Sequence, residues 1–375
     1  MTTTSPEPGH WYEIADVEDV PSPALVFYPE RIEENVRRMI RMAGEAGRLR
    51  PHVKTHKCAE IVKLQLAHGI RKFKCSTIAE AEMAASAGAP DVLLAMQPVG
   101  PAIGRFFALQ QAYPGTAFAA IVDAEAIAGE IARAAAAAGT DACLWLDVDS
   151  GMNRTGIAPG ADAARLYRRI HESPGLRAGG LHVYDGHIHE SDVAERTRVC
   201  DAQFAPVADL IDSLAASGLP VPSVVAGGSP TFPIHAKRAG VELSPGTPLL
   251  WDAGYGAAYP DLDFLVAAVI VSRVVSKPGG SLVCLDLGTK AVASEMPQPR
   301  ASLLGVGEHR VAAHNEEHLV VDVPDPGRFG IGDVVYAVPV HICPTVARYE
   351  TAVVAERGRR TGEWPIAARN RRITV

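Results

Sequence analysis

The stretch RPHVKTHK (50–57) places His52, Lys54 and His56 at alternate positions. Alternate residues of a β-strand share one face, so this spacing predicts that the three side chains point the same way and that Lys57 points the other way. An unpaired ammonium is costly to bury, so Lys54 needs an explanation. One interpretation is an ion pair with an acidic residue. The other is a lysine whose pKa is lowered by desolvation and by the neighbouring histidines, an amine nucleophile that forms a Schiff base.

A second group comes from the stretch DVDSGMNRTG (147–156). Asp147 and Asp149 alternate with core residues, and Arg154 follows where a strand is predicted to end. A guanidinium at a strand end commonly orients an oxyanion or a phenolate. It equally suits a structural ion pair with either aspartate, and both interpretations stay open from these residues alone.

The stretch GLHVYDGHIHES (180–191) gathers four rings that can transfer protons. His182 and Tyr184 alternate, and His187 and His189 follow within five residues. A single histidine is more often structural than catalytic. Four such rings in eight positions instead predict a functional cluster.

A glycine-rich stretch, VVAGGSPTF (224–232), has the composition of an anion-binding loop. Glycines let backbone N–H groups approach a ligand closely, and the hydroxyls stand at a predicted helix start, where a barrel commonly binds phosphate. The segment ELSPGTPLL (242–250) completes this site. The candidate phosphate-binding residues are Gly227, Gly228, Ser229, Thr231, Gly246 and Thr247. A lysine at one strand end and a phosphate site at another suggest pyridoxal phosphate (PLP) more than a nucleotide.

The stretch VPVHICPTV (338–346) places His341 and Cys343 two residues apart. On a strand both would point the same way, and imidazole with thiolate favours zinc or a similar divalent ion. Two ligands are too few for a structural site, whereas a catalytic site keeps positions for water and substrate. The alternative is that the two side chains merely fill a strand face.

The elements that position these groups follow a β-then-α rhythm. Eight apolar runs alternate with Ala- and Glu-rich helical stretches, which predicts a (β/α)8 barrel more strongly than an open doubly wound sheet. The expected strands are 24–28, 50–56, 72–77, 91–96, 117–124, 142–150, 179–186 and 223–229. After about residue 255, strands separated by Gly, Pro and Asp turns predict a β-domain. The expected division is an N-terminal segment (1–22) that packs with the β-domain, a barrel (23–254) and a C-terminal β-domain with the metal ligands (255–375).

Composition narrows the class of protein. The chain has 375 residues, 47% of them hydrophobic, and a formal net charge of −7, which argues against a nucleic-acid surface. The N-terminal residues lack a basic region followed by an apolar run, and no apolar stretch has the length to cross a bilayer. Six cysteines without paired spacing indicate reduced thiols. We therefore expect a cytoplasmic protein without nucleic-acid or membrane partners.

Five of these stretches, taken together, resemble a known family. RPHVKTHK, DVDSGMNRTG, VYDGHI, AGGSPTF and HICPT occur in family order from residue 50 to 345. The chain thus resembles the fold-type III PLP enzymes, specifically the D-threonine aldolase and D-serine dehydratase group, which is related to alanine racemase. The resemblance implies a PLP barrel, a C-terminal β-domain and a homodimer. It also implies a divalent metal (Mn, Mg or Zn) and a small D-3-hydroxy amino acid as substrate.

The resemblance also implies roles for single residues. Lys54 would be the Schiff-base lysine, with His52 and His56 keeping its surroundings polar and His56 counted among the catalytic residues. Arg154 would contact the cofactor's phenolate and Tyr184 would line its ring. Gly228 and Ser229 would contact the phosphate, and His341 and Cys343 would hold the metal.

Two outcomes of this chemistry compete. Deprotonation of the substrate's β-hydroxyl breaks Cα–Cβ and gives glycine and an aldehyde, whereas removal of the α-proton by Lys54 gives a keto acid and ammonia. The His-x-Cys pair resembles the dehydratases. A histidine soon after Tyr184, His189 in preference to His187, resembles the aldolases, and we expect the aldolase. Alanine racemase activity is disfavoured by the metal pair, and a non-catalytic PLP-homeostasis role by the β-domain.

Overall fold

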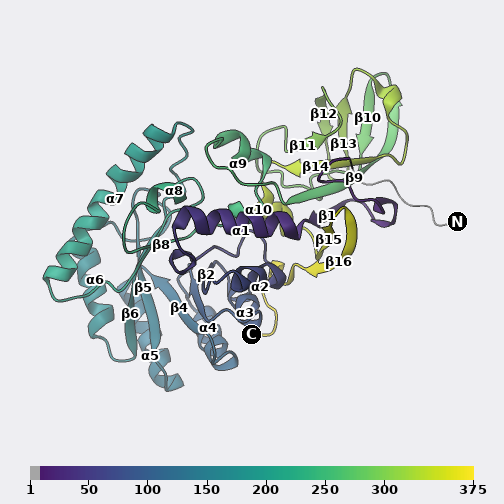
Figure 1. Cartoon of the computed structure of the whole chain (residues 1–375). Coiled ribbons are helices and arrows are strands. Elements are labelled where there is room, and N and C mark those ends of the chain that lie inside the picture. The colour runs from purple at the N-terminus through teal and green to yellow at the C-terminus, as the bar shows by residue number, and fades with distance from the viewer. Residues whose placement is uncertain (1–8) are drawn as a thin grey trace. The chain divides into compact units, whose positions relative to one another are not determined.

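The computed structural model describes residues 9–375, so the first eight residues of the expected N-terminal segment lie outside the described part. The chain forms two compact units, and each contains segments that are distant in the sequence (Figure 1). The barrel unit comprises residues 37–54, 59–246 and 370–375. The β-unit comprises the described residues 9–36, together with 55–58 and 247–369.

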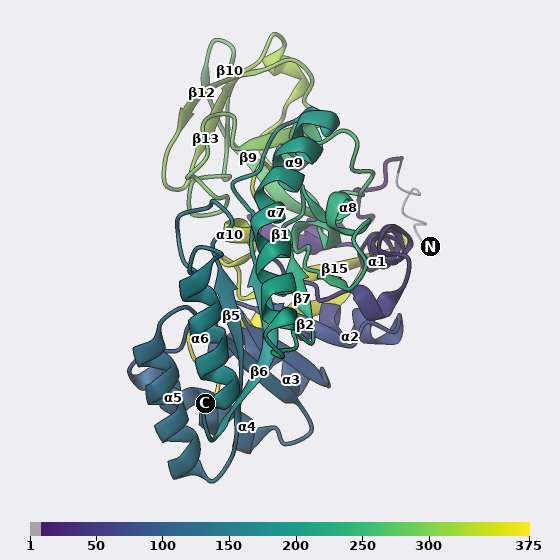
Figure 2. The same ribbon diagram turned by 90° about the vertical axis from the view of Figure 1, so that its left-hand side faces the viewer.

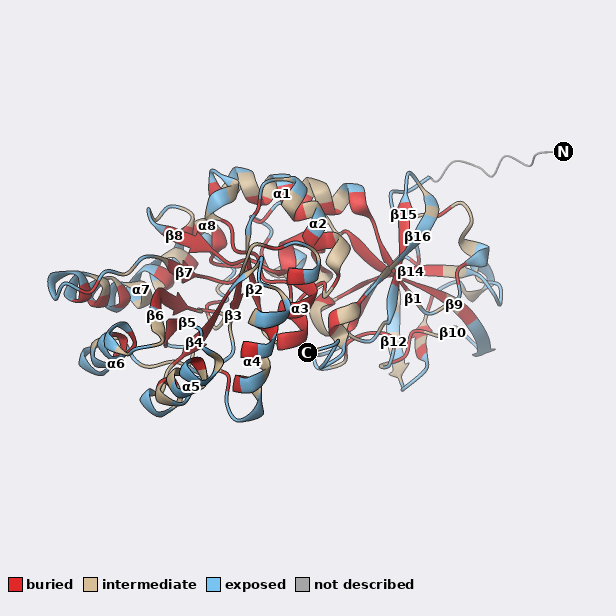
Figure 3. Ribbon diagram, turned by 90° about the horizontal axis from the view of Figure 1, so that it is seen from below, coloured by how far each residue is buried: buried red, intermediate tan, exposed pale blue. Residues whose placement is uncertain are grey.

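The barrel unit is built on seven parallel strands that pair in sequence order from β2 to β8. They are β2 (Lys72–Cys75), β3 (Asp91–Leu94), β4 (Ala117–Val122), β5 (Ala142–Val148), β6 (Leu176–Val183), β7 (Val224–Ala226) and β8 (Val241–Leu243). Short runs of apolar and β-branched residues suit strands buried on both faces, and Figure 3 shows most of them as buried. The prediction of a barrel rather than an open sheet is confirmed by the way this sheet closes.

Residues 49–53 close the sheet between its two edge strands. Leu49 forms a parallel bridge with Leu243 of β8, and His52 forms one with Lys74 of β2. The Val53 N–H donates to the Lys74 carbonyl at 2.8 Å, which is the last ladder bond of this segment. The eighth position of the barrel is therefore held by a short segment that ends one residue before Lys54.

Three details of the strand prediction were wrong. Residues 24–28 do not begin the barrel, because β1 (Ala24–Phe27) pairs with strands of the β-unit. The barrel instead gains β8, three residues too short for a periodic signal. The expected strand 50–56 turns after Val53, and Lys57 has φ +52°, so His56 does not share a face with Lys54.

Helices connect the barrel strands and lie outside them, as Figure 2 shows for α5 and α6. They are α2 (Ala59–Ala67), α3 (Ile78–Ser86), α4 (Pro101–Ala112), α5 (Glu125–Ala138), α6 (Ala161–Glu172), α7 (Val193–Ala216) and α8 (Phe232–His235). Helix α6 shows why they pack this way, because its buried residues recur at helical spacing (Ala163, Leu166, Tyr167 and Ile170). Within residues 9–375, no helix combines the length and the hydrophobicity needed to cross a membrane.

The β-unit contains one sheet of nine strands. Its main order is β12-β13-β10-β9-β1-β15-β16, with β14 paired to both β9 and β11. The strands after β1 are β9 (Ala268–Gly279), β10 (Leu282–Leu285), β11 (Ala301–Leu304), β12 (Arg310–His314), β13 (Leu319–Asp322), β14 (Val334–Pro339), β15 (Thr351–Glu356) and β16 (Arg359–Pro365). The unit also holds α9 (Ala253–Ala258) and α10 (Ile342–Val346), while α1 (Pro29–Ala43) begins in this unit and ends in the barrel unit. The predicted C-terminal β-domain is confirmed as a sheet domain.

Candidate active site

A cavity of about 450 Å³ opens in the barrel unit at the carboxyl ends of its strands, where barrel enzymes place their chemistry. Its lining comes from the closing segment, from β2 to β6 and from the turns that follow them. The lining residues are His52, Lys54, Lys74, Ser76, Ala95, Met96, Gln97, Ile121, Asp123, Asp147, Arg154, Thr155, His182 and Tyr184. Five predicted residues from three separate stretches, His52, Lys54, Arg154, His182 and Tyr184, therefore meet in one place.

Lys54 is held at the start of the turn that follows the closing segment. The backbone N–H of Lys54 donates to Nδ1 of His52 at 3.2 Å, so this histidine helps to set the turn. The Lys54 ammonium lies 5.7 Å from the centre of the Tyr184 ring. The lysine is thus presented to the cavity by a short turn, whereas the sequence predicted a continuing strand.

Tyr184 is the common neighbour of the cations in this cavity. The Arg154 guanidinium lies 4.9 Å from its ring centre and the Lys74 ammonium 5.3 Å. Among the described residues, Arg154 forms no salt bridge with Asp147 or Asp149, because Asp149 instead accepts the backbone N–H groups of its own turn. The ion-pair interpretation of Arg154 therefore fails, and its charge stays available to a ligand.

Asp147 and His182 form a buried pair on the neighbouring strands β5 and β6. The His182 Nδ1 lies 2.7 Å from Asp147 Oδ1. Burial lowers the pKa of His182 and the Asp147 hydrogen bond offsets this only in part, so the ring is neutral. Burial alone would raise the pKa of Asp147, but the His182 contact lowers it. The neutral ring donates from Nδ1, and its Nε2 is buried without a hydrogen-bond partner among the described residues.

The predicted phosphate loop is braced from behind by Asp185, the residue after Tyr184. Asp185 Oδ1 accepts from the Gly228 N–H at 3.0 Å and from the Thr231 hydroxyl at 2.8 Å. Gly227 has φ +84°, and a Cβ there would come within 2.8 Å of the His235 ring, so this position requires glycine. The polar groups of Gly228 and Thr231 are thus used inside the protein. The Gly246 N–H likewise donates to the Ser229 hydroxyl at 3.4 Å, and phosphate binding at this loop stays a prediction.

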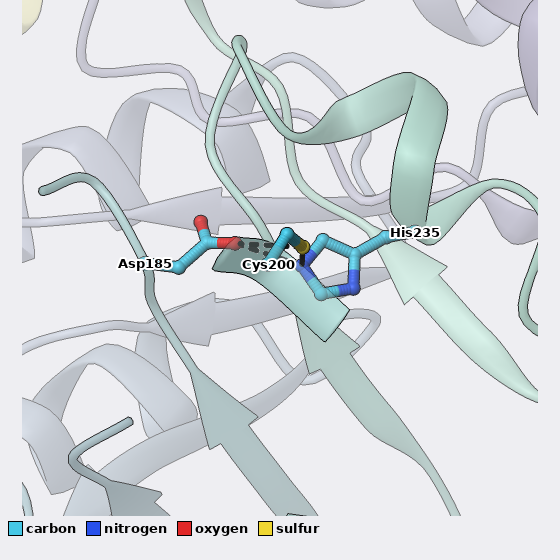
Figure 4. Close-up of side chains that lie close together, drawn as sticks. All are labelled: Asp185, Cys200 and His235. Carbon is cyan, nitrogen blue, oxygen red and sulfur yellow. Dashed lines mark hydrogen bonds and ion pairs between the residues drawn. The ribbon is translucent and has the colours of Figure 1, made fainter. Parts of the chain in front are cut away.

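Asp185 also belongs to a buried cluster with Cys200 and His235, in which three potential metal ligands lie within 4.8 Å of one another (Figure 4). Its groups are already paired: His235 Nε2 lies 2.8 Å from Asp185 Oδ2, and the Arg238 guanidinium lies 3.1 Å from His235 Nδ1. Burial raises the pKa of the Cys200 thiol to about 12, so it remains protonated. A cation beside the cluster and a neutral thiol identify it as a hydrogen-bonded support of the loop.

The two candidate proton acceptors after Tyr184 do not line the cavity. His189 is exposed, and its Nδ1 is bonded to the carbonyl of His187. A carbonyl only accepts, so Nδ1 of His189 carries the proton and Nε2 keeps its lone pair. The His187 Nε2 is bonded to the Gln203 side-chain oxygen at 2.6 Å. Both rings therefore have one basic nitrogen left.

His56 differs from the other predicted residues. Its ring is fully buried in the β-unit, where Nδ1 lies 3.2 Å from the backbone N of Cys58. Burial lowers the pKa of His56 to about 3, so the ring is neutral. Its expected catalytic role stays a prediction, and the buried ring favours a structural role in the turn.

The candidate metal pair lies in the β-unit, at the start of helix α10. His341 is the residue before this helix and Cys343 is in its first turn, so the predicted strand geometry was wrong. The carboxylate of Asp252 accepts the Ile342 N–H between them at 3.0 Å. The His341 Nδ1 lies 2.5 Å from Glu295 Oε1, which leaves Nε2 for a metal.

Cys343 has two hydroxyl neighbours within the β-unit. Its Sγ lies 3.2 Å from the hydroxyl of Thr55 and 3.8 Å from that of Thr247. A divalent ion of borderline softness fits one imidazole nitrogen and one thiolate. Glu295 was not identified from the sequence, although a histidine ligand generally needs such a partner to orient its ring.

The cavity in the barrel unit fits the chemistry of PLP. It presents a primary amine (Lys54), a guanidinium (Arg154) and an aromatic face (Tyr184). It also contains a buried imidazole nitrogen without a partner, the Nε2 of His182. An anionic, aromatic aldehyde would meet complementary groups on each of these sides.

Comparison with known proteins agrees with this chemistry. Residues 29–250 match the family described as alanine racemase, N-terminal domain, and residues 267–355 match the putative serine dehydratase domain. The chain is 32% identical to a D-threonine aldolase of an Arthrobacter species, over 93% of each chain. It is 29% identical to D-threo-3-hydroxyaspartate dehydratase of Delftia sp. (strain HT23), over 88% of this chain and 92% of that one.

Solved structures extend the similarity to the fold. The crystal structure of D-threonine aldolase from Filomicrobium marinum superposes with a TM-score of 0.87 at 27% identity, covering 94% of this chain and 96% of that one. Relatives of both kinds, aldolase and dehydratase, are lyases, and they share the barrel and the sheet domain described above. The chain is therefore a PLP-dependent lyase, and it belongs to the alanine racemase-like family of fold-type III enzymes that includes the D-threonine aldolases and D-serine dehydratases.

Proposed function

We propose that this protein is a PLP- and divalent-metal-dependent aldolase that cleaves D-3-hydroxy amino acids between Cα and Cβ, giving glycine and an aldehyde. The observation that carries the proposal is the set of groups around Tyr184 in the cavity. His189, five residues further along the chain, is exposed and does not line the cavity, and its Nδ1 hydrogen bond leaves the lone pair on Nε2. The similarity to a D-threonine aldolase over 93% of the chain supports the same activity.

The residues of the cavity have distinct tasks in this reaction. Lys54 would hold PLP through its amine. Arg154 would offset the negative charge of its ring oxygen, and Tyr184 would line its ring. Ser229, Gly246 and Thr247 would contact its phosphate. When bound, PLP withdraws electrons from Cα of the attached amino acid, which is what makes cleavage of a bond at Cα possible.

Proton transfer falls to the histidine after Tyr184. His189 accepts the proton of the substrate's β-hydroxyl at Nε2, the Cα–Cβ electron pair moves toward Cα, and the hydroxyl carbon leaves as an aldehyde. A proton is then returned to Cα, which completes glycine. Because Nδ1 donates to the His187 carbonyl, Nε2 is the ring nitrogen that can accept this proton.

His341 and Cys343 would hold the divalent ion, and Glu295 would orient the His341 ring. The ion would lower the pKa of the substrate's hydroxyl, as metals do for bound water. Solved forms of D-threo-3-hydroxyaspartate dehydratase include one histidine variant and one metal-free cysteine variant, and the two replaced residues stand two positions apart. That spacing matches His341 and Cys343.

The same His-x-Cys pair favours a second candidate function, dehydration of a D-3-hydroxy amino acid. In that case Lys54 removes the α-proton while the β-hydroxyl leaves, and the product hydrolyses to a keto acid and ammonia. The metal pair serves both reactions. The discriminating group is the histidine after Tyr184, which only the aldolase needs as a base.

Product analysis tests the two functions directly. Purified, PLP-loaded protein is incubated with D-threonine and with D-serine, with and without a chelator. Glycine plus acetaldehyde from D-threonine, lost on chelation and restored by Mn, Mg or Zn, is the expected result. Pyruvate and ammonia from D-serine, without aldehyde from D-threonine, would establish the dehydratase instead.

Paired variants test the proton acceptor. His189→Ala should lower aldolase turnover by about 100-fold or more, the usual worth of a general base, while keeping the cofactor's visible absorbance. His187→Ala is the matched control, because it lies two residues away on the same turn. Loss of turnover in His187→Ala alone would transfer the role to that residue.

We also infer a homodimer in the cytoplasm. The six cysteines are all free thiols, as expected in a reducing compartment. Light scattering on the purified protein should give twice the chain mass.

A further inference from the structure

Lys74 is a second lysine in the cavity, and the proposed function assigns it no task. It lies on β2, beside the closing segment, and its side chain is 2% exposed. It lines the cavity together with Lys54 and Arg154. The sequence offered a signal, since Lys72 and Lys74 alternate in the apolar run KFKCS as Lys54 does among its histidines.

The ammonium of Lys74 has no hydrogen-bond or salt-bridge partner among residues 9–375. It lies over the face of Tyr184, 5.3 Å from the ring centre. Two carboxylates act on Lys74 through their charge without forming a salt bridge to it. Asp185 is bonded to His235 and the phosphate loop, and Asp147 is bonded to His182 through Oδ1, while its Oδ2 has no hydrogen-bond partner among the described residues. Lys72, two residues earlier on the same strand, instead pairs with Glu242 at 2.6 Å.

A buried cation without a counter-charge destabilises the folded chain. Burial, together with the charges of Lys54 and Arg154, lowers the pKa of Lys74 to about 7, although Asp185 and Asp147 act in the opposite direction. A buried lysine without a salt bridge is tolerated when a bound ligand supplies the missing negative charge. The missing partner must be an anion that enters the cavity.

We propose that Lys74 is an anion-binding residue of this cavity, whose ammonium pairs with a negatively charged oxygen of the bound ligand. Two ligand groups could supply such an oxygen in this cavity: the ring oxygen of PLP and the carboxylate of the amino-acid substrate. The three cations Lys54, Lys74 and Arg154 all lie within 5.7 Å of the centre of the Tyr184 ring. This arrangement supports the first source, because an anionic aromatic ligand beside Tyr184 would meet all three charges.

This inference rests on the proposed use of the cavity for PLP, and the first measurement separates the two. Cofactor-free protein is titrated with PLP and binding is followed by absorbance. If the unaltered protein does not bind PLP, the function fails together with the inference. If it binds PLP and Lys74→Met affects neither PLP nor substrate, only the role of Lys74 is overturned.

The test compares Lys74→Met, which keeps the length of the side chain, with Lys74→Arg, which keeps the charge. Loss of a charge-assisted contact should weaken PLP binding by about 10- to 100-fold in Lys74→Met, with partial recovery in Lys74→Arg. Lys72→Met is the matched control and should bind PLP within about twofold of the unaltered protein.

A cofactor analogue identifies the source of the anion. PLP methylated on its ring oxygen cannot carry the negative charge, so it should bind less well than PLP to the unaltered protein and show a smaller difference in Lys74→Met. If PLP affinity is instead unchanged and KM for D-threonine rises about 10-fold at constant kcat, the partner is the substrate carboxylate.

The thermal unfolding midpoint of the cofactor-free protein shows whether weaker PLP binding is caused by misfolding of the variant. Lys74→Met removes a buried cation without a partner, so its midpoint should equal or exceed that of the unaltered protein. A clear decrease would show that Lys74 has a structural partner, and this would overturn the inference.

Discussion

The two ends of the barrel both contain charged residues, but only one end pairs them. At the amino ends of the strands, Arg50 is 2% exposed and bonds Asp91 and Glu242, each at 2.6 Å. Lys72 completes this network through Glu242. At the carboxyl ends, Lys54, Lys74 and Arg154 surround Tyr184 without a salt bridge among the described residues.

The difference separates stabilising charges from functional ones. A buried charge is tolerated when its partners lie in the chain, as for Arg50, whose pKa the two carboxylates raise although burial lowers it. A cation that lacks such a partner costs stability in the free protein and becomes useful when a ligand supplies the anion. Removing a charge should therefore impair stability at one end and binding at the other.

The largest effect is expected at the carboxyl end. Lys54→Ala should lower turnover by more than about 1000-fold and remove the visible absorbance of the bound cofactor, because the attacking amine is lost. Its thermal midpoint should stay within a few degrees of that of the unaltered protein. Lys63→Ala, an exposed lysine on α2, is the control and should leave turnover unchanged. Turnover retained by Lys54→Ala would refute the assignment.

The next largest effect is expected at the amino end. Arg50→Met leaves Asp91 and Glu242 without their shared partner, which should lower the free energy of unfolding by about 3 kcal/mol. Urea denaturation measures this change. Turnover per folded molecule should remain near that of the unaltered protein, because no atom of Arg50 lines the cavity.

An exposed ion pair provides the matched control for Arg50. Arg165 pairs with Asp162 across one turn of α6, and both side chains are about two-thirds exposed. Arg165→Met should change the free energy of unfolding by less than about 0.5 kcal/mol. An equal loss in both variants would mean that burial does not distinguish the two pairs.

The last effect concerns pH and Lys74. The folded state lowers the pKa of Lys74 from 10.5 to about 7, so the folded chain binds fewer protons than the unfolded one between these values. Its stability therefore rises with pH across this window, and the full penalty applies below pH 7.

Lys74→Met removes this penalty. In cofactor-free protein the variant should be more stable than the unaltered chain by about 5 kcal/mol at pH 6, and the gain should vanish as the pH rises past 10. Urea denaturation at several pH values measures the difference. A gain that does not depend on pH would point to packing as its cause.

Sequence patterns predicted the structure best where the spacing of apolar residues within one segment was enough to identify a helix or a strand. The alternation of strands and helices predicted the barrel, and five side chains from three of the stretches singled out in the sequence line one cavity, whereas their roles there stay predictions. Prediction failed where the periodic signal was too short or misleading. Residues 24–28 have the pattern of a barrel strand, yet β1 pairs with β9 and β15 instead. The three residues of β8 gave no usable signal.

The sequence by itself determined which groups are present and, through alternation, that Lys54, Arg154, His182 and Tyr184 lie on or just after strands of one barrel. Tertiary structure decided which charges are paired, because pairing depends on neighbours far away in the chain, such as Arg50 with Glu242. It also gave Lys74 its place against Tyr184, and it turned the chain after Val53 so that His56 lies elsewhere. The spacing of apolar residues along the chain indicates which face of a helix or strand a residue occupies. The partner of a buried charge is decided only when strands that are distant in the sequence come together in the fold.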